Sequence, residues 1–178
     1  PSPSKTEASY TQEEIRQLLT QVRDASEYTI VLTLAQTGCR RGELCSLTIE
    51  NLHDHYALVT GKPTRANKSG QRVLYLADEC YEALRKHLAL FRRMTWRGNP
   101  LNEGMLSSFM RRLEKQAGIY EIGQNTHAFR RAYEAEFIHN GGSELFLDEI
   151  LGHRKMDMRS LYFNAPVLTS IPIPESAP

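Results

Sequence analysis

The chain has 178 residues, of which 40% are hydrophobic and 24% are charged, and its formal net charge at pH 7 is +1. This composition is typical of one globular domain and gives no overall basic signal for a nucleic-acid partner. Three cysteines without a C-x-x-C pair argue against a disulfide framework and indicate a reduced protein. No apolar run approaches the ~20 residues of a membrane span, so we expect no membrane partner. Basic residues gather between positions 85 and 131, either as a face for a phosphate backbone or as solvated helix surface.

The first part of the chain is predicted to be helical. Residues 1–9 are rich in Pro and Ser and are expected to form a flexible leader or linker remnant. Thr11 and Glu14 then form a capping-box pattern at the start of an amphipathic helix. A second, nearly all-apolar helix is predicted from about Tyr28 to Gln36, with Gly38 ending it. The stretch "RRGELCSL" adds another helical piece.

The rest of the chain adds one hairpin and four helices. The β-favouring runs "HYALVTG" and "RVLYL" flank the polar stretch "KPTRANKSGQ", which predicts a hairpin at about 55–76 with a long tip. Asp78, Asn102, Thr126 and Ser143 are each expected to cap a following helix. We therefore predict an α+β domain that is mainly α, with one small antiparallel β-sheet and a single core.

Two motifs place arginines beside helix ends. In "TGCRRGEL", Arg40 follows a glycine stop in an apolar neighbourhood, where it either binds an anion or forms a structural salt bridge with Glu43. In "THAFRRAYEAEF", His127 and Arg130 share one face at a helix start. Free N–H groups at a helix start also favour an anion, so this pair is suited to a phosphate. Arg131 is expected to face solvent or a DNA backbone.

Other polar residues are weaker signals when taken singly. Lys68 on the hairpin tip either reaches into a site or is a solvated loop lysine. His153 follows a helix end in "LGHRKMDMRSLYFN", and Tyr162 lies nine residues further on, where a half-buried aromatic is the plain alternative. His53 and His55 have no further ligands at metal-binding spacing, so we expect a surface loop and no metal.

The order of these motifs resembles the catalytic domain of the tyrosine recombinase (phage integrase) family from Tyr10 to Asn164. "TGCRRGEL" is similar to the family's T-G-x-R-x-x-E-L box. "HAFRR" is similar to its H-x-L-R-H box, with Phe129 in place of leucine and Arg131 in place of the final histidine. "ILGHRKMDMRSLY" is similar to its L-G-H box followed by the tyrosine at the usual distance.

The resemblance implies a fold, a site and a set of roles. The implied catalytic residues are Arg40, Lys68, His127, Arg130, His153 and Tyr162, with Tyr162 as the nucleophile. Lys62 also resembles the family's hairpin lysine, so the choice between Lys62 and Lys68 stays open, with Lys68 preferred. Glu43 would orient Arg40. The expected contacts to the DNA backbone are Arg41, Lys62, Arg65, Arg131, Arg154 and Lys155.

The implied activity is that of a site-specific recombinase. Such an enzyme cleaves and rejoins DNA strands through a covalent 3′-phosphotyrosine. The resemblance implies double-stranded DNA as the partner, no cofactor and no metal. It also implies a homo-tetramer on DNA for the full-length protein, a monomer for the isolated fragment, and a cytoplasmic, nucleoid-associated location. A type IB topoisomerase and a non-catalytic DNA-binding relative are the two alternatives.

The expected domain organisation follows the same resemblance. Residues 10–164 form the catalytic domain, and nothing in the sequence represents the N-terminal core-binding domain that family members carry. We therefore expect a catalytic fragment that binds DNA weakly on its own. Residues 165–178 form a tail that is expected either to dock on a neighbouring protomer or to stay loose.

Overall fold

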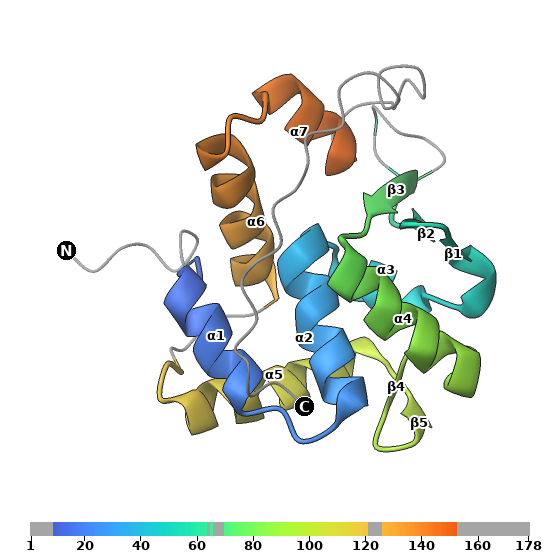
Figure 1. Ribbon diagram of the computed structural model, residues 1–178, viewed down its shortest axis with the longest axis vertical. Coiled ribbons are helices and arrows are strands. Elements are labelled where there is room, and N and C mark those ends of the chain that lie inside the picture. The colour runs from blue at the N-terminus through green and yellow to red at the C-terminus, as the bar shows by residue number, and fades with distance from the viewer. Residues whose placement is uncertain (1–8, 64, 66–69, 121–125, 153–178) are drawn as a thin grey trace.

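The computed structural model describes residues 9–63, 65, 70–120 and 126–152, which form a mainly helical domain with two small antiparallel sheets (Figure 1). The predicted α+β class is therefore confirmed. The helices are α1 (Gln12–Thr20), α2 (Ala25–Thr37), α3 (Arg41–Ser46), α4 (Asp78–Phe91), α5 (Glu103–Ala117), α6 (His127–His139) and α7 (Glu144–Ile150), with a 3-10 turn, η1, at Ile49–Asn51. The strands are β1 (Leu52–His53), β2 (Tyr56–Thr60), β3 (Gln71–Tyr75), β4 (Thr95–Trp96) and β5 (Asn99–Pro100).

Helix α2 is the centre of the fold. It begins earlier than predicted because the Asp24 side chain accepts a hydrogen bond from the Glu27 amide at 2.9 Å. It ends at Gly38, whose φ of +60° is the left-handed conformation that favours glycine. Apolar residues on all its sides are buried, which suits a helix packed against α1, α4 and α6 at once (Figure 1).

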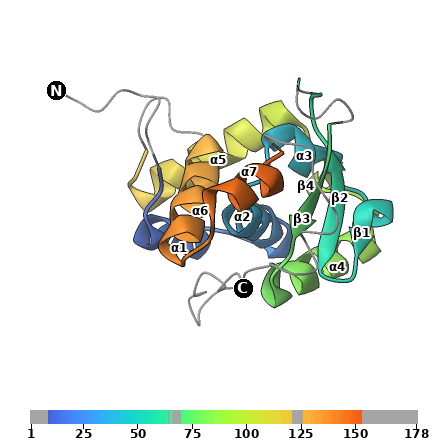
Figure 2. The same ribbon diagram turned by 90° about the horizontal axis from the view of Figure 1, so that it is seen from above.

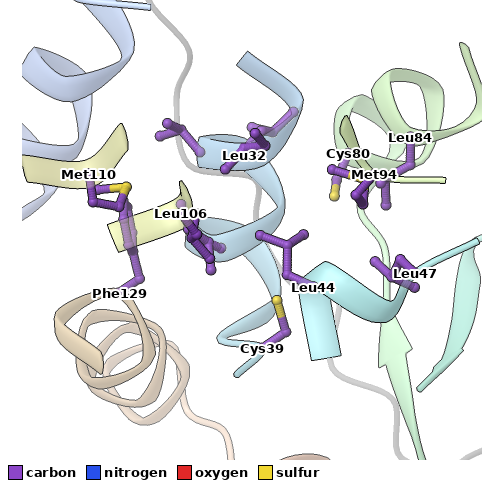
Figure 3. Packing of buried hydrophobic residues seen from close by; sticks show 14 of the residues in the cluster. Leu32, Cys39, Leu44, Leu47, Cys80, Leu84, Met94, Leu106, Met110 and Phe129 are labelled. Carbon is purple, nitrogen blue, oxygen red and sulfur yellow. The ribbon is translucent and has the colours of Figure 1, made fainter. Parts of the chain in front are cut away.

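The surrounding helices turn one apolar face toward α2. Leu106 and Met110 of α5 and Phe129 of α6 meet α2 at one end of the core, while Leu84 of α4 and Leu47 lie at the other (Figure 3). All five side chains are at least 98% buried. This continuous core fixes the positions of α3 and the start of α6, which carry the predicted site residues.

The predicted hairpin is present, and two further pairings accompany it. Strands β2 and β3 pair antiparallel from Tyr56↔Tyr75 to Thr60↔Gln71, and β1 extends the sheet at the β2 edge. Strands β4 and β5 form a second, two-stranded sheet. The expectation of only one sheet was wrong, because two-residue strands are too short to show a period-2 pattern.

Helices α6 and α7 form a second, smaller apolar cluster. Tyr133 and Phe137 of α6 pack with Phe146, Leu147 and neighbouring residues of α7, and Tyr75 of β3 lies against them. Figure 2 shows α7 between α6 on one side and α3 and β3 on the other. The C-terminus of α7 is thereby brought close to both α3 and β3.

Two of the four predicted caps differ in detail. Asn102 and Ser143 each accept a hydrogen bond at the helix start, as expected. Ala77 occupies the cap position of α4, so the prediction for Asp78 was wrong by one residue. The Asp78 carboxylate instead accepts a hydrogen bond from His55 Nε2 at 2.9 Å. Thr126 precedes α6 but makes no side-chain cap bond.

An ion pair joins the start of α2 to α5. Glu27, only 2% exposed, accepts a hydrogen bond from the Trp96 indole at 3.0 Å and pairs with Arg112 at 2.5 Å. Burial alone would raise the Glu27 pKa, but hydrogen bonds, that from Trp96 foremost, lower it below its ordinary value. On the surface, Arg92 pairs with Glu50 at 2.8 Å. The basic segment 85–131 is therefore not one uniform cationic face, because carboxylates engage some of its arginines.

None of the described helices is long and apolar enough to span a bilayer. The three cysteines, which all lie in the described part of the chain, are free thiols.

Candidate functional site

Arg40 lies at the junction between α2 and α3. Its backbone N–H donates to Glu43 Oε2 at 2.7 Å and its Nη1 donates to Glu43 Oε1 at 3.2 Å, so the predicted salt bridge exists. Among the residues that the structure describes, the Arg40 guanidinium makes no further hydrogen bond, and the side chain stays 32% exposed. Glu43 thus anchors one nitrogen of the guanidinium, while Nε and Nη2 have no hydrogen-bond partner within the described ranges.

The stronger partner of Glu43 is Arg72 on β3. Arg72 Nε donates to Oε1 at 2.8 Å and Nη2 donates to Oε2 at 2.6 Å, which makes a two-pronged pair with both side chains 1% exposed. Burial would raise the Glu43 pKa, but the Arg72 hydrogen bonds and charge, with a smaller contribution from Arg40, lower it. Glu43 is therefore an ionised carboxylate shared by two guanidiniums.

Arg130 enters the same region from α6. Its Nη1 donates to the Gly38 carbonyl at 3.0 Å and its Nη2 donates to the Leu151 carbonyl at 2.8 Å. Glu134, one turn along the helix, lies 3.6 Å from its Nε. Burial, followed by the nearby charges of Arg72 and Arg40, lowers the Arg130 pKa to about 10, so the side chain remains cationic at neutral pH.

His127 is the first residue of α6 and is exposed at the edge of this cluster. Partial burial and then the charges of Arg130, Arg41, Arg131 and Arg40 lower its pKa below the ordinary histidine value. The ring is consequently neutral at neutral pH and able to accept a proton. The structure thus brings Arg40, His127 and Arg130, which come from separate motifs, into one electrostatic neighbourhood.

The other predicted residues lie around or beyond this cluster. Arg41 joins α3 to α5, with Nη1 3.2 Å from Ser107 Oγ and Nε 3.7 Å from a Glu103 carboxylate oxygen. Lys62 and Arg65 are exposed on the hairpin tip. Lys68, His153, Arg154, Lys155 and Tyr162 lie outside the described residues, as do positions 1–8 and the predicted tail 165–178.

Arg72 is the member of the cluster that sequence reasoning missed. The signal that could have found it is its phase in the strand, because Arg72 and Leu74 are two residues apart and point to the same, buried face. An arginine in phase with core residues requires a buried anionic partner. Nothing local to β3 identifies that partner, because Glu43 lies 29 residues away in the sequence.

The described cluster carries more positive than negative charge. Among the described residues, Arg40 and Arg72 both pair with Glu43, and Arg130 lies 3.6 Å from Glu134. Planar guanidiniums bind anions that have several acceptor oxygens through paired, charge-assisted hydrogen bonds, so three guanidiniums in one region are suited to a phosphate group. Within the described ranges, no group of three or more His, Cys, Asp or Glu residues could hold a metal ion.

Comparison with known proteins gives a consistent result along the sequence. A protein-family model described as the Phage integrase family matches residues 9–167. The integrase of Escherichia phage P2 is 32% identical over 160 residues, which cover 89% of this chain and 43% of that protein. Tyrosine recombinase XerD of Chlamydia muridarum is 26% identical over 144 residues, covering 75% of this chain and 46% of the relative. The chain thus spans less than half the length of these two relatives.

Solved structures agree with the fold. The XerA recombinase has a TM-score of 0.72 and 26% identity, covering 90% of this chain and 61% of that chain. The Tn1549 transposon integrase in complex with transposon right end DNA has a TM-score of 0.68 and 18% identity, covering 92% of this chain and 63% of that one. The second likeness, at this low identity, is one of fold alone.

Proposed function

Because this chain belongs to the phage integrase family, we propose that it cleaves and rejoins DNA strands through a covalent 3′-phosphotyrosine at Tyr162. The observation that carries the proposal is the guanidinium cluster. Arg40 is paired with the ionised Glu43 carboxylate, the charges of Arg72 and Arg40 act on nearby Arg130, and the pKa of His127 at their edge is depressed. This combination suits a phosphodiester, which is itself an anion and gathers more charge as it is attacked.

Each group has a role in the proposed reaction. Arg40 and Arg130 bind the non-bridging oxygens, where planar forks make paired hydrogen bonds that strengthen as charge develops. The Tyr162 oxygen attacks phosphorus, its proton passes to neutral His127, and the P–O5′ bond breaks. A hairpin lysine, Lys68 or Lys62, protonates the departing 5′-oxygen. Rejoining is the reverse, with a 5′-hydroxyl displacing the tyrosine.

Other predicted residues have supporting roles. His153 would donate a hydrogen bond to a non-bridging oxygen. Arg41, Arg65 and Arg131 would contact the flanking backbone, which positions DNA without reading its sequence. Arg154 and Lys155 would do the same beside His153.

The chain spans less than half of the two relatives compared above, so we attribute to it the strand-cleavage chemistry and only part of DNA recognition. We propose that residues 10–164 act as the catalytic domain of a recombinase that assembles as a homo-tetramer on DNA when full length, while the isolated fragment is a monomer. Cross-linking on and off DNA tests the assembly, and dimers or tetramers without DNA would contradict the monomer assignment.

The proposed chemistry can be tested without knowing the DNA target. The protein is incubated with a pool of nicked duplexes of randomised sequence, and adducts that survive denaturation in SDS are digested with trypsin. Trypsin cuts after Arg159, and residues 160–178 contain no Lys or Arg and one tyrosine, so the DNA-linked peptide should begin at Ser160 and carry the DNA on Tyr162. Tyr162→Phe should abolish the adduct, and Tyr120→Phe, at an exposed tyrosine, should not.

Three outcomes of this assay separate the alternatives. An adduct that persists in Tyr162→Phe refutes the nucleophile. Specific DNA binding with no adduct in any condition would indicate a non-catalytic DNA-binding relative. Relaxation of supercoiled DNA by a monomer, without strand exchange, would indicate a type IB topoisomerase. Lys62→Ala and Lys68→Ala in the same assay identify the lysine, because only loss of the proton donor should slow cleavage strongly.

A further inference from the structure

We propose that Arg72 is a positioning residue of the phosphate pocket. Arg72 pairs with both carboxylate oxygens of Glu43 and holds the end of α7, and Arg40 thereby stays available to a phosphate. The inference rests on the proposed function for its biological meaning. The buried Arg72 guanidinium, on β3, contacts both α3 and the end of α7. Arg72 itself is 2% exposed, and its Nε, Nη1 and Nη2 all donate to Glu43 or to the Ile150 carbonyl, so it would act through Arg40 and not by its own contact with DNA.

Arg72 and Arg40 share the charge of one carboxylate, that of Glu43. Glu43 has two carboxylate oxygens, and Arg72 engages both, at 2.8 and 2.6 Å, whereas Arg40 makes one side-chain contact at the longer distance of 3.2 Å. Without Arg72, the buried carboxylate would have Arg40 as its nearest cation and would draw the guanidinium into a two-pronged pair. A guanidinium neutralised in that way has less charge and fewer N–H groups for a ligand.

Arg72 also contacts the end of α7. The last carbonyls of a helix lack partners within the helix and carry partial negative charge. Arg72 Nη1 donates to the Ile150 carbonyl, and Arg130 Nη2 donates to the next one, that of Leu151, at 2.8 Å. Two buried arginines therefore hold consecutive carbonyls at the point where the chain leaves α7 toward His153.

Close packing fixes this contact further. A side chain at Gly152 would place its Cβ 3.0 Å from Arg72 Cδ, so the backbone passes directly over the arginine. A Cβ at Gly61, at the base of the hairpin, would similarly lie 3.0 Å from Glu43 Oε1. The Gly61 N–H donates to the Gly70 carbonyl at 2.9 Å, which closes the hairpin beside the ion pair. The Arg72–Glu43 pair thus joins α3, the hairpin base and the end of α7.

Four variants separate the parts of this role. Arg72→Lys keeps the charge beside Glu43 but lacks the fork needed to reach both Glu43 and α7. Arg72→Met removes the charge and leaves Glu43 to Arg40. The double variant Arg72→Met with Glu43→Gln removes both charges and frees Arg40 again. Arg16→Met, at an exposed arginine paired with Glu13 at 3.4 Å, is the matched control.

The probe is inorganic phosphate, followed through the NMR signal of the Arg40 Nε–H group, with Arg40→Lys used to assign that signal. We expect a saturable response in the unaltered chain and in Arg16→Met. Affinity should fall about tenfold in Arg72→Met, equivalent to one bidentate contact, and less in Arg72→Lys. The double variant should recover to within about threefold of the unaltered chain, because no carboxylate then competes for Arg40.

The recovery distinguishes positioning from a purely structural role, since a second core substitution does not by itself restore a binding site. Should Arg72→Met fail to fold, Arg72→Lys and the double variant carry the test. The proposal is overturned if Arg72→Lys or folded Arg72→Met binds phosphate as tightly as the unaltered chain. It is also overturned if the double variant stays as weak as Arg72→Met, or if Arg40 never responds to phosphate. Absence of a Tyr162 adduct alongside the expected phosphate results would refute the proposed function and leave the role of Arg72 intact.

Discussion

Gly38 lies between the core and the candidate site, and Gly38→Ala tests how closely α2 packs against α6 at this point. The residue has a φ of +60°, and an added Cβ would lie 2.9, 3.1 and 3.2 Å from three atoms of Tyr133 on α6. The left-handed conformation costs an alanine about 1–2 kcal/mol. Overpacking a buried contact costs about 1–3 kcal/mol more. We therefore expect a loss of about 2–5 kcal/mol, a large part of the ~5–15 kcal/mol that stabilises a typical domain.

Urea unfolding followed by fluorescence measures this loss, because Trp96 is the single tryptophan and is 92% buried. Gly118→Ala is the matched control. Gly118 also ends a helix in the left-handed conformation, at φ +72°, but a Cβ there would meet nothing within 4 Å. The control should lose only the conformational part, about 1–2 kcal/mol. Equal losses in the two variants would refute the close packing of α2 against α6, and with it the rigid placement of the Gly38 carbonyl that accepts from Arg130.

Three further predictions concern charged groups. Glu27→Gln should cost about 3 kcal/mol at pH 7, because it leaves Arg112 half-paired in the core. The Glu27 pKa is lowered on folding, so the stabilisation by its carboxylate is lost as pH falls below about 4.3. In urea titrations, the difference in unfolding free energy between the unaltered chain and Glu27→Gln should shrink over that range, and a difference that grew would contradict the pairing. His55 has a raised pKa because two carboxylates, that of Asp54 foremost, flank its ring, so His55→Gln should lower the melting temperature more at pH 5.5 than at pH 8.5. The reverse order would exclude a stabilising imidazolium. Because the His127 pKa is lowered, the rate of adduct formation should fall with acid only below about pH 6.5. The Arg41 charge contributes to this lowering, so Arg41→Gln should shift the fall in rate to higher pH. An unchanged pH profile would argue against His127 as the base.

The sequence predicted the candidate site unevenly, and the distances between residues explain why. Arg40 and Glu43 are three residues apart at a helix start, so their pairing follows from local geometry. His127 and Arg130 are likewise three residues apart on one helix. The resemblance of both motifs to boxes of one protein family predicted that the two pairs belong to the same site. Arg72 belongs to no such local pattern. Its partner lies in another element, and only the packing of β3 against α3 brings them together.

Local sequence by itself determined most helix positions, the β2–β3 hairpin and the order of the candidate site residues. Those features depend on caps, turns and periodicities that act over a few residues, so neighbouring side chains suffice to specify them. The tertiary structure decided what the charges do. It left the Arg40 side chain 32% exposed. It also brought Arg72 and Arg130 into hydrogen bonds with the carbonyls of Ile150 and Leu151 at the end of α7. It also buried Glu43. A buried, ionised carboxylate is stable only beside cationic partners, and these can lie far away along the chain.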